Sequence, residues 1–245
     1  MVYKKNYLSD VIFKLHFPVI LGLVENAPKE FQDKIIKNFP ILEPIQQVQI
    51  HIENRGLEFN TERKNRTVWK FKSKDGSANI ELDYESLAII QNKYTDFTTF
   101  RELVSTISSI FFTIYPDIVI KRLGLRYINQ IKLTEKDFFV WDKYINENFI
   151  SFLNFVDDKN NLRRILSTIE LDNGNDSNLI IKYGIFNSTY PGKITQKEFI
   201  LDYDCYTNIE FENTKLLEKC DEFHKTIIQN FEKSILDDFR GKLNE

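Results

Sequence analysis

The stretch Asp117-Ile-Val-Ile-Lys-Arg-Leu-Gly-Leu-Arg-Tyr-Ile-Asn-Gln-Ile-Lys-Leu133 lies at the middle of the chain and alternates in side-chain type. One face of the strand that it predicts carries Val119, Lys121, Leu123, Leu125, Tyr127, Asn129 and Ile131. The opposite face carries Ile118, Ile120, Arg122, Gly124, Arg126 and Ile128. Period-two spacing with β-branched and aromatic residues is typical of a β-strand. The glycine within it indicates a bulge or a close backbone approach.

Upstream of this strand, hydrophobic periodicity and turn residues divide the chain into short elements. Strands are expected at residues 10–21, 48–52, 67–74 and 79–90. Helices are expected from Pro28, with Phe31, Ile35 and Phe39 on one face, and from Asp96 through Ile114. Residues 55–66 are polar and charged, which predicts a loop, whereas Asp75-Gly76 predicts a hairpin turn.

Downstream, the pattern of elements begins again. Thr134-x-x-Asp137 resembles a capping box, and it predicts an aromatic helix that continues through Phe152. Strands are then expected at residues 163–171, 179–186 and 197–206, and a last helix at 214–240. Both halves therefore read β-α-β-β-β-α. Leu82-Asp-Tyr-Glu85 matches Leu201-Asp-Tyr-Asp204, which favours an internal duplication, although four residues can match by chance.

The fold class that follows is α+β, with duplicated β-α-β-β-β-α units in which curved antiparallel sheets pack on long helices. Residues 1–116 form the first unit and residues 117–245 the second, fused into one globular body. The last helix is apolar over an arc wider than one sheet contact needs. We therefore expect it to be buried between the halves or to form a homodimer interface through Phe223, Ile227, Ile228, Phe231 and Ile235.

Composition places the chain among ordinary globular proteins, with 42% hydrophobic and 28% charged residues in a length of 245. Its net charge of −3 does not attract nucleic acid globally, so only a local patch could do so. Cys205 and Cys220 are the two cysteines and are expected to be reduced. The opening Met-Val-Tyr-Lys-Lys lacks the apolar region of a signal peptide, and no apolar run is long enough to span a bilayer. We expect a cytoplasmic protein that does not enter membranes.

Catalytic and cofactor motifs are missing from the sequence. His16, His51 and His224 do not form metal-binding spacings, and no C-x-x-C pair, nucleophile elbow or phosphate loop occurs. We interpret the histidines and cysteines as structural residues. The sequence therefore predicts a protein that is not an enzyme and holds neither a metal nor a cofactor.

Two groups of carboxylates occupy matched places and offer an alternative. Asp83, Glu85, Asp202 and Asp204 could hold a divalent cation for phosphodiester cleavage. Acids that alternate along a strand are equally suited to a solvated edge, or to ion pairs with Arg122 and Arg126. We favour these two structural interpretations over catalysis.

Basic residues also cluster locally. Arg63, Lys64 and Arg66 fall in the expected loop, and Lys74 ends the strand that follows it. If several clusters share one face, they would form a surface that contacts phosphates or a partner. The residues that we select for this contact are Lys70, Lys72, Lys121, Arg122, Arg126, Arg163 and Arg164. A lysine-lined strand is, however, more often simply a solvated sheet edge.

The chain resembles a sporadically distributed family of uncharacterised bacterial proteins of about this length. The resemblance rests on Arg122-Leu-Gly-Leu-Arg-Tyr-Ile-Asn129, on Leu201-Asp-Tyr-Asp204, and on the ending His224, Phe231-Glu232 and Asp238-x-Arg240. It covers nearly the whole chain but brings no catalytic residues with it. The proline-rich opening of such proteins is replaced here by Ser9-Asp10-Val11. Proteins of this family occur patchily, as defence-linked genes do. In overall likeness the chain also resembles the dimeric pro-CRISPR accessory proteins that accompany some type II RNA-guided nucleases and help them engage DNA.

These observations lead to one principal hypothesis and two alternatives. The principal hypothesis is a non-enzymatic homodimeric accessory protein of prokaryotic antiviral defence, which binds and enhances a large type II CRISPR nuclease, its DNA, or both. The first alternative is a small-ligand-binding module of the helix-grip kind, whose cavity the many Phe and Tyr side chains would line. The second is a metal-dependent nuclease that uses the four carboxylates.

Overall fold

A computed structural model of the chain describes residues 3–55 and 58–245, and the side chains of residues 3–47 and 66–245. The strands within these residues are β1 (Leu8–His16), β2 (Ile41–Arg55), β3 (Glu58–Lys72), β4 (Ala78–Leu82), β5 (Ser86–Gln91), β6 (Arg122–Leu133), β7 (Ile165–Gly174), β8 (Ser177–Ile185) and β9 (Lys197–Thr207). The helices are α1 (Leu21–Glu25), α2 (Lys29–Ile35), α3 (Phe97–Ile114), α4 (Leu216–Ser234) and α5 (Asp237–Asn244). The expected α+β class is confirmed.

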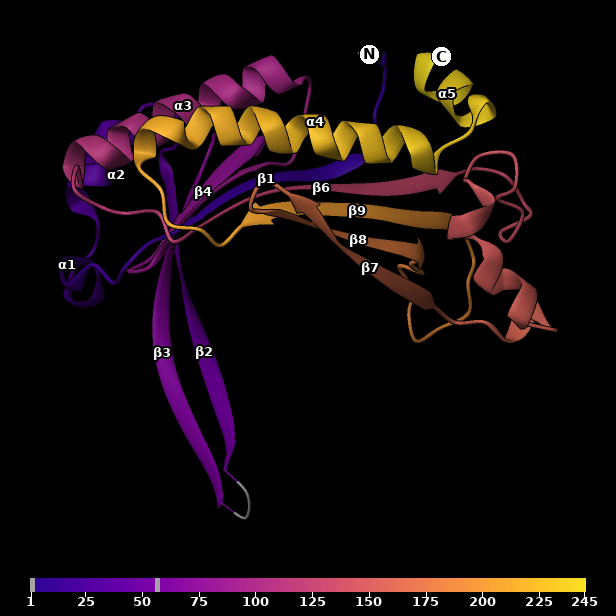
Figure 1. Cartoon of the computed structure of the whole chain (residues 1–245), viewed down its shortest axis with the longest axis horizontal. Coiled ribbons are helices and arrows are strands. Elements are labelled where there is room, and N and C mark those ends of the chain that lie inside the picture. The colour runs from indigo at the N-terminus through magenta and orange to yellow at the C-terminus, as the bar shows by residue number, and fades with distance from the viewer. Residues whose placement is uncertain (1–2, 56–57) are drawn as a thin grey trace.

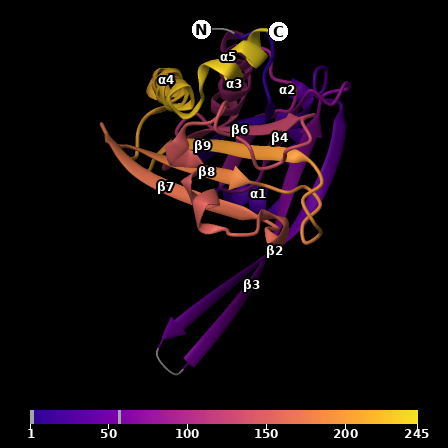
Figure 2. The same cartoon turned by 90° about the vertical axis from the view of Figure 1, so that its right-hand side faces the viewer.

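The nine strands of the described residues form one antiparallel sheet in the order β2-β3-β4-β5-β1-β6-β9-β8-β7. The long helices α3 and α4 lie side by side on one side of this sheet (Figure 1). A view from the end shows the same layers, with the β2–β3 hairpin leaving the body on the side away from the two helices (Figure 2). The boundary expected at residues 116 and 117 falls between α3 and β6, and β1 pairs with β6 across it.

The central stretch forms strand β6, as its alternating side chains predict. Leu123, Leu125, Tyr127 and Ile131 are at most 2% exposed, and α4 packs on this strand. Gly124 pairs with Lys14 of β1 and with Tyr206 of β9 without a register shift, so this fully described strand does not contain the expected bulge. The strand begins only at Arg122, because Ile120 instead forms an isolated bridge with Phe211.

The two long helices bury apolar stripes against the sheet. Asp96 caps α3 by accepting a hydrogen bond of 2.9 Å from the backbone N–H of Thr99, as an N-cap carboxylate is expected to do. The buried stripe of α3 includes Phe100, Val104, Ile107 and Phe111, and that of α4 includes Leu216, Cys220, Phe223 and Ile227. Arg101 joins the two helices through a bidentate ion pair with Asp221, at 2.6 and 2.9 Å.

The expected loop at residues 55–66 is wrong, because these residues belong to a long hairpin. β2 and β3 pair over fifteen positions, from Ile41–Lys72 to Arg55–Glu58. β4 pairs with β3 only from Trp69 to Lys72, so most of the hairpin extends past the sheet. We call residues 45–55 and 58–68 the arm. Backbone hydrogen bonds hold such a strand pair without an apolar side-chain pattern, and the polar sequence therefore concealed it.

Two expected strands are shorter than predicted. The strand expected at 10–21 ends at His16, and residues 21–25 form α1. The strand expected at 79–90 is two strands joined by a turn, in which Asp83 Oδ1 accepts from the backbone N–H groups of Glu85 and Ser86 at 2.8 Å each. Leu82–Glu85 therefore forms this turn, whereas Leu201–Asp204 lies inside β9. The two matching tetrapeptides do not occupy equivalent places.

The helix expected at 134–152 is replaced by irregular chain and short 3-10 turns at Glu147–Phe149 and Ser151–Phe155. This segment folds around Lys197, which is 1% exposed. The Lys197 ammonium lies 2.6 Å from Glu135 Oε2 and 5.2 Å from the ring centroids of Trp141 and Tyr144. The hydrogen bond from Lys197, together with one from Tyr144, lowers the pKa of Glu135 to about 2. Contacts with Lys197, which is distant in sequence, thus accompany an irregular chain where the local pattern predicts a helix.

The helix expected at 214–240 is also interrupted. α4 ends at Ser234, and Ile235 adopts an extended backbone that bridges Ile145. Two backbone hydrogen bonds fix this break, from Asn146 N–H to Ser234 O and from Leu236 N–H to Tyr144 O, both 2.9 Å. Strand-like pairing with the 141–146 segment therefore replaces the helical hydrogen bonds, after which α5 begins.

Gly184 provides a test of the β7–β8 pairing. Its φ is +140°, and a Cβ at this position would overlap the carbonyl oxygen of Ile165. We expect Gly184→Ala to lower the free energy of unfolding by about 2 kcal/mol or more, because the backbone must shift or remain strained. Gly22→Ala is the matched control, because open space surrounds Gly22, and it should stay within about 0.5 kcal/mol of the parent. Urea unfolding measures both, and equal stability of the two variants would contradict the pairing.

Candidate binding sites

The seven basic residues selected from the sequence lie in three separate places. Lys70 and Lys72 are on β3, Lys121, Arg122 and Arg126 are at or within β6, and Arg163 and Arg164 precede β7. Strands β4, β5 and β1 separate β3 from β6, and β9 and β8 separate β6 from β7. The pairing register puts Lys70, Lys72, Arg122 and Arg126 on the sheet face opposite α3 and α4. They share a face but do not form one continuous patch.

Acidic neighbours neutralise three of these residues. Lys70 Nζ lies 2.8 Å from Glu81 Oε1, and Lys72 pairs with Glu43. Arg126 donates from Nε and Nη2 to the two carboxylate oxygens of Asp202, at 2.8 and 2.6 Å. This hydrogen bonding raises the pKa of Arg126 further. The interpretation of the β9 acids as ion-pair partners is therefore confirmed for Asp202.

The other four residues are held differently. The Arg122 guanidinium stacks 4.0 Å from the ring centroid of Tyr206, and that of Arg164 stacks 4.0 Å from Tyr190. Arg163 donates to the carbonyl of Asn160 at 3.0 Å. Lys121 is exposed. The three guanidinium groups are thus held by aromatic rings or by a backbone carbonyl. Of the four residues, Lys121 is therefore the most free to contact a partner.

The four carboxylates proposed as metal ligands are dispersed. Asp83 and Glu85 both bind Arg66, which is 6% exposed, and Ser86 also donates to Asp83 at 2.7 Å. Asp202 is occupied by Arg126, and burial raises the pKa of Asp204. The turn that holds Asp83 joins β4 to β5, and β1 and β6 lie between β5 and β9, so three strand spacings, or roughly 14 Å, separate β5 from β9. Among the described residues, no group of three His, Cys, Asp or Glu side chains is arranged to hold a metal ion.

The residues selected as a dimer interface are largely used inside the chain. Phe223, Ile227 and Ile235 are at most 2% exposed, so they cannot contact a second copy while this fold is kept. Ile228 and Phe231 are half-buried and line a cavity. The wide apolar arc of α4 is thus explained by contacts with the sheet, with the N-terminal segment and with α5.

The two cysteines are buried, and the two histidines whose side chains are described are partly buried. Cys205 and Cys220 are buried free thiols, and burial raises the pKa of each to about 12. Burial lowers the pKa of both His16 and His224 to about 4. The side chain of His51 lies outside the described residues, as do those of Arg63 and Lys64.

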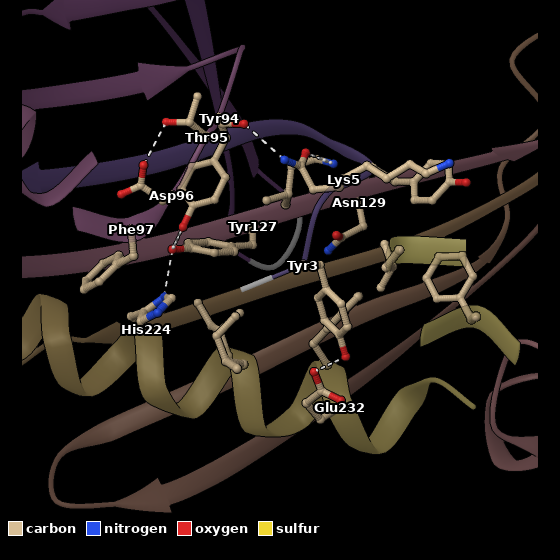
Figure 3. A pocket seen from close by; sticks show the side chains of 18 residues that line it. Tyr3, Lys5, Tyr94, Thr95, Asp96, Phe97, Tyr127, Asn129, His224 and Glu232 are labelled. Atoms are coloured by element: carbon tan, nitrogen blue, oxygen red, sulfur yellow. Dashed lines mark hydrogen bonds between the residues drawn. The ribbon is translucent and has the colours of Figure 1, made fainter. Parts of the chain in front are cut away.

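A cavity lies between α4, β6 and the N-terminal segment, by which we mean residues 3–8 (Figure 3). Its volume is about 220 Å³. Most of its wall is apolar or aromatic, and the residues that form this wall include Tyr7, Leu8, Ile227, Ile228, Phe231 and Phe239. The N-terminal segment is held in place by backbone hydrogen bonds from Lys5 N–H to Leu243 O and from Gln130 N–H to Tyr7 O, at 3.0 and 2.8 Å.

Polar side chains converge at one part of this cavity. The hydroxyl of Tyr127 lies 2.9 Å from Nδ1 of His224 and 3.4 Å from the hydroxyl of Tyr94. The imidazole of His224 stacks on Phe97 with a centroid distance of 3.7 Å and an interplanar angle of 4°. Asn129 lies two residues along β6 and also lines the cavity. Figure 3 shows the hydrogen-bonded row of Tyr94, Tyr127 and His224.

These residues come from four distant parts of the chain, at positions 3–8, 94–97, 127–129 and 224–243. The many Phe and Tyr residues of the sequence predict that aromatic side chains could line a cavity, but they do not predict which residues do so. No local spacing joins an N-terminal tyrosine to a histidine more than two hundred residues later. Pairing of β1 with β6 and packing of α4 bring them together.

Comparison with known proteins adds no family. The chain matches no protein-family model, and no curated protein matches it either. Within the described part of the chain, none of the helices has both the length and the apolar character that a membrane crossing requires.

Arg126 supports the fold, and its removal tests this. Arg126→Met leaves the Asp202 carboxylate, 4% exposed, without its partner. We expect a loss of about 1–3 kcal/mol in the free energy of unfolding, below the usual cost of a broken buried pair because Arg126 itself is partly solvated. Arg122→Met is the control and should cost no more than about 1 kcal/mol. Equal losses in guanidinium chloride unfolding would contradict the assignment, and the double variant with Asp202→Asn should recover stability.

His16 and His224 make the fold sensitive to mild acid. Their folded-state pKa of about 4 lies below the ordinary value of 6.5, so the unfolded chain takes up protons first as the pH falls. Stability should therefore decrease from about pH 6.5 toward pH 4. We expect urea unfolding at pH 7.5 and pH 5 to show this decrease, and His224→Gln to reduce it. A titration midpoint of the His224 imidazole near 6.5 by NMR would contradict the prediction.

Proposed function

We propose that this chain is a binding protein that docks on a protein partner through the arm. The observation that carries the proposal is the backbone geometry of β2 and β3. β2 pairs only with β3, and the arm residues of β3 pair only with β2. Two long rows of backbone N–H and C=O groups therefore lack strand neighbours within the described residues.

Unpaired strand edges are templates for a further strand. A partner that adds an extended segment to either edge would gain backbone hydrogen bonds along its length, as in β-augmentation. The arm also extends away from the compact body (Figure 1), so a large partner can reach it without contacting the helices. This position favours a macromolecule over a small ligand as the occupant.

The sequence of the arm favours a protein over nucleic acid. Residues 48–65 contain three glutamates, Glu53, Glu58 and Glu62, against Arg55, Arg63 and Lys64. Their formal charges cancel, whereas binding to a phosphate backbone needs an excess of positive charge. On the body, acids neutralise Lys70, Lys72 and Arg126. We therefore rank direct contact with DNA below contact with a protein.

The partner that we propose is a large RNA-guided nuclease of type II CRISPR defence, in the cytoplasm. Resemblance of the central stretch to the sporadic bacterial family motivates this choice. We further propose that the chain acts without catalysis. Asp83, Glu85 and Asp202, the residues most suited to hold a catalytic cation, are each bonded to an arginine.

An internal duplication and a homodimer belong to the same proposal. From the centre outward the strand order is β1-β5-β4-β3 on one side and β6-β9-β8-β7 on the other, and a long helix follows β5 and β9. This symmetry supports duplicated units, with β2 as the addition that completes the arm. For the homodimer we propose the outer edge of β7, where Leu166 and Leu171 are 49% and 39% exposed, in place of α4.

Truncation of the arm tests the proposal. Gln47 and Arg66 face each other in the hairpin, so residues 48–65 can be replaced by an Asn-Gly turn. This variant keeps Arg66 and its bonds to Asp83 and Glu85. We expect unchanged thermal unfolding, because none of the described core residues is removed, and loss of partner binding.

The measurement is affinity capture from the native host with the parent and the truncated chain. The nuclease should be recovered in a fixed ratio with the parent and lost with the truncated chain. Equal recovery of the nuclease by both chains, or its absence from both, would contradict the proposal. Light scattering of the purified parent should give twice the mass of one chain, and the mass of a single chain would reject the homodimer.

A further inference from the structure

We propose that the cavity between α4, β6 and the N-terminal segment binds a neutral, mostly apolar small molecule with one hydroxyl-like group directed at Tyr127, Asn129 and His224. This site is separate from the arm and does not depend on the proposed protein partner. Three features support the proposal: the size of the cavity, the position of its polar groups, and the absence of a free charge among the described lining residues.

The volume sets the size of the ligand. A dry apolar cavity of about 150 Å³ is large enough for benzene. By that measure the 220 Å³ found here holds about nine non-hydrogen atoms. Well-packed interiors contain few voids larger than a water molecule. A space of this size beside α4 is therefore more than a packing defect.

The polar residues define where a hydroxyl would lie. Burial holds His224 neutral at pH 7, because it lowers the pKa to about 4. Neutral His224 has one ring hydrogen, and the tautomer with that hydrogen on Nε2 allows the Tyr127 hydroxyl to donate to Nδ1 across 2.9 Å. Asn129 uses its Nδ2 to donate to Leu201 O at 3.1 Å, so its Oδ1 remains as an acceptor among the described lining groups. A hydroxyl can accept from one such group and donate to another.

The charged lining residues are already engaged, which argues for a neutral ligand. Asp96 caps α3 through Thr99. Glu232 accepts from the Tyr3 hydroxyl at 2.6 Å and from Arg240 at 3.0 Å. Lys5 lies 3.7 Å from Glu245. A charged ligand would lose its hydration without gaining an unpaired counterion among the described lining residues.

Two probe molecules of nine non-hydrogen atoms distinguish the effect of ligand shape on binding from the effect of a hydrogen bond. We choose 4-ethylphenol and its isostere 1-ethyl-4-methylbenzene, which replaces the hydroxyl by a methyl group. We expect the phenol to bind the full chain at sub-millimolar concentration in ligand-observed NMR. The hydrocarbon should bind about fivefold more weakly, the effect of one neutral hydrogen bond. Failure of the phenol to bind at millimolar concentration, or equal binding of the two probes, would overturn the proposal.

Two variants locate the site. Ile228→Trp should fill the cavity and abolish binding of both probes, whereas Gln229→Trp is the control, because Gln229 is exposed one position further along α4. Tyr127→Phe should weaken binding of the phenol by about fivefold and leave binding of the hydrocarbon unchanged. If Ile228→Trp does not fold by circular dichroism, Ile228→Phe replaces it, with a partial loss expected. Undiminished binding by the folded filling variant would also overturn the proposal.

Discussion

Pairing between β1 and β6 is the interaction on which the remaining structure depends. Eight positions, from Leu8–Asn129 to His16–Arg122, join the N-terminal strand to the central one. Through this pair a single sheet continues from β5 to β9, and both long helices find one continuous apolar face. Phe13 and Leu15 of β1 are fully buried beside Leu123 and Leu125 of β6. Without this ladder each half would expose an edge strand and half of a core.

The two faces of the sheet differ in the interactions that stabilise them. The face under α3 and α4 buries apolar area, which supplies most of the stability. The opposite face carries charged residues close to one another, and it keeps them by pairing, as in Arg126–Asp202 and Lys70–Glu81. Guanidinium groups that lack an acid stack on aromatic rings, as Arg122 does on Tyr206. A basic residue on this surface is therefore a poor guide to a nucleic-acid contact.

The cavity follows from the way in which α4 ends. Residues 141–146 pair with the chain at Ser234 and Ile235 and stop the helix. α5 then packs beside the N-terminal segment, where Tyr7 stacks on Phe239 with a centroid distance of 5.5 Å. Among the described residues, the side chains of the N-terminal segment, β6, α4 and α5 meet around a space that they do not fill. The arm, in contrast, leaves the sheet as a two-stranded hairpin whose strands pair with each other along its length.

The sequence by itself determined the parts of the molecule that rest on local periodicity. The alternation of β6, the helical stripe from Phe100 to Phe111 and the Asp75-Gly76 hairpin all follow from spacing between neighbours, as does the α+β class. It also allowed an ion pair between Arg126 and an acid of β9. Only the tertiary structure decided the rest. Lys197 packs against the segment around Trp141, where a helix was expected, and residues 141–146 pair with the chain where α4 ends. The cavity unites Tyr3, Tyr127 and His224 in the same way. In each case a group distant in sequence supplies the deciding hydrogen bond or contact, and local patterns contain no record of such distant partners.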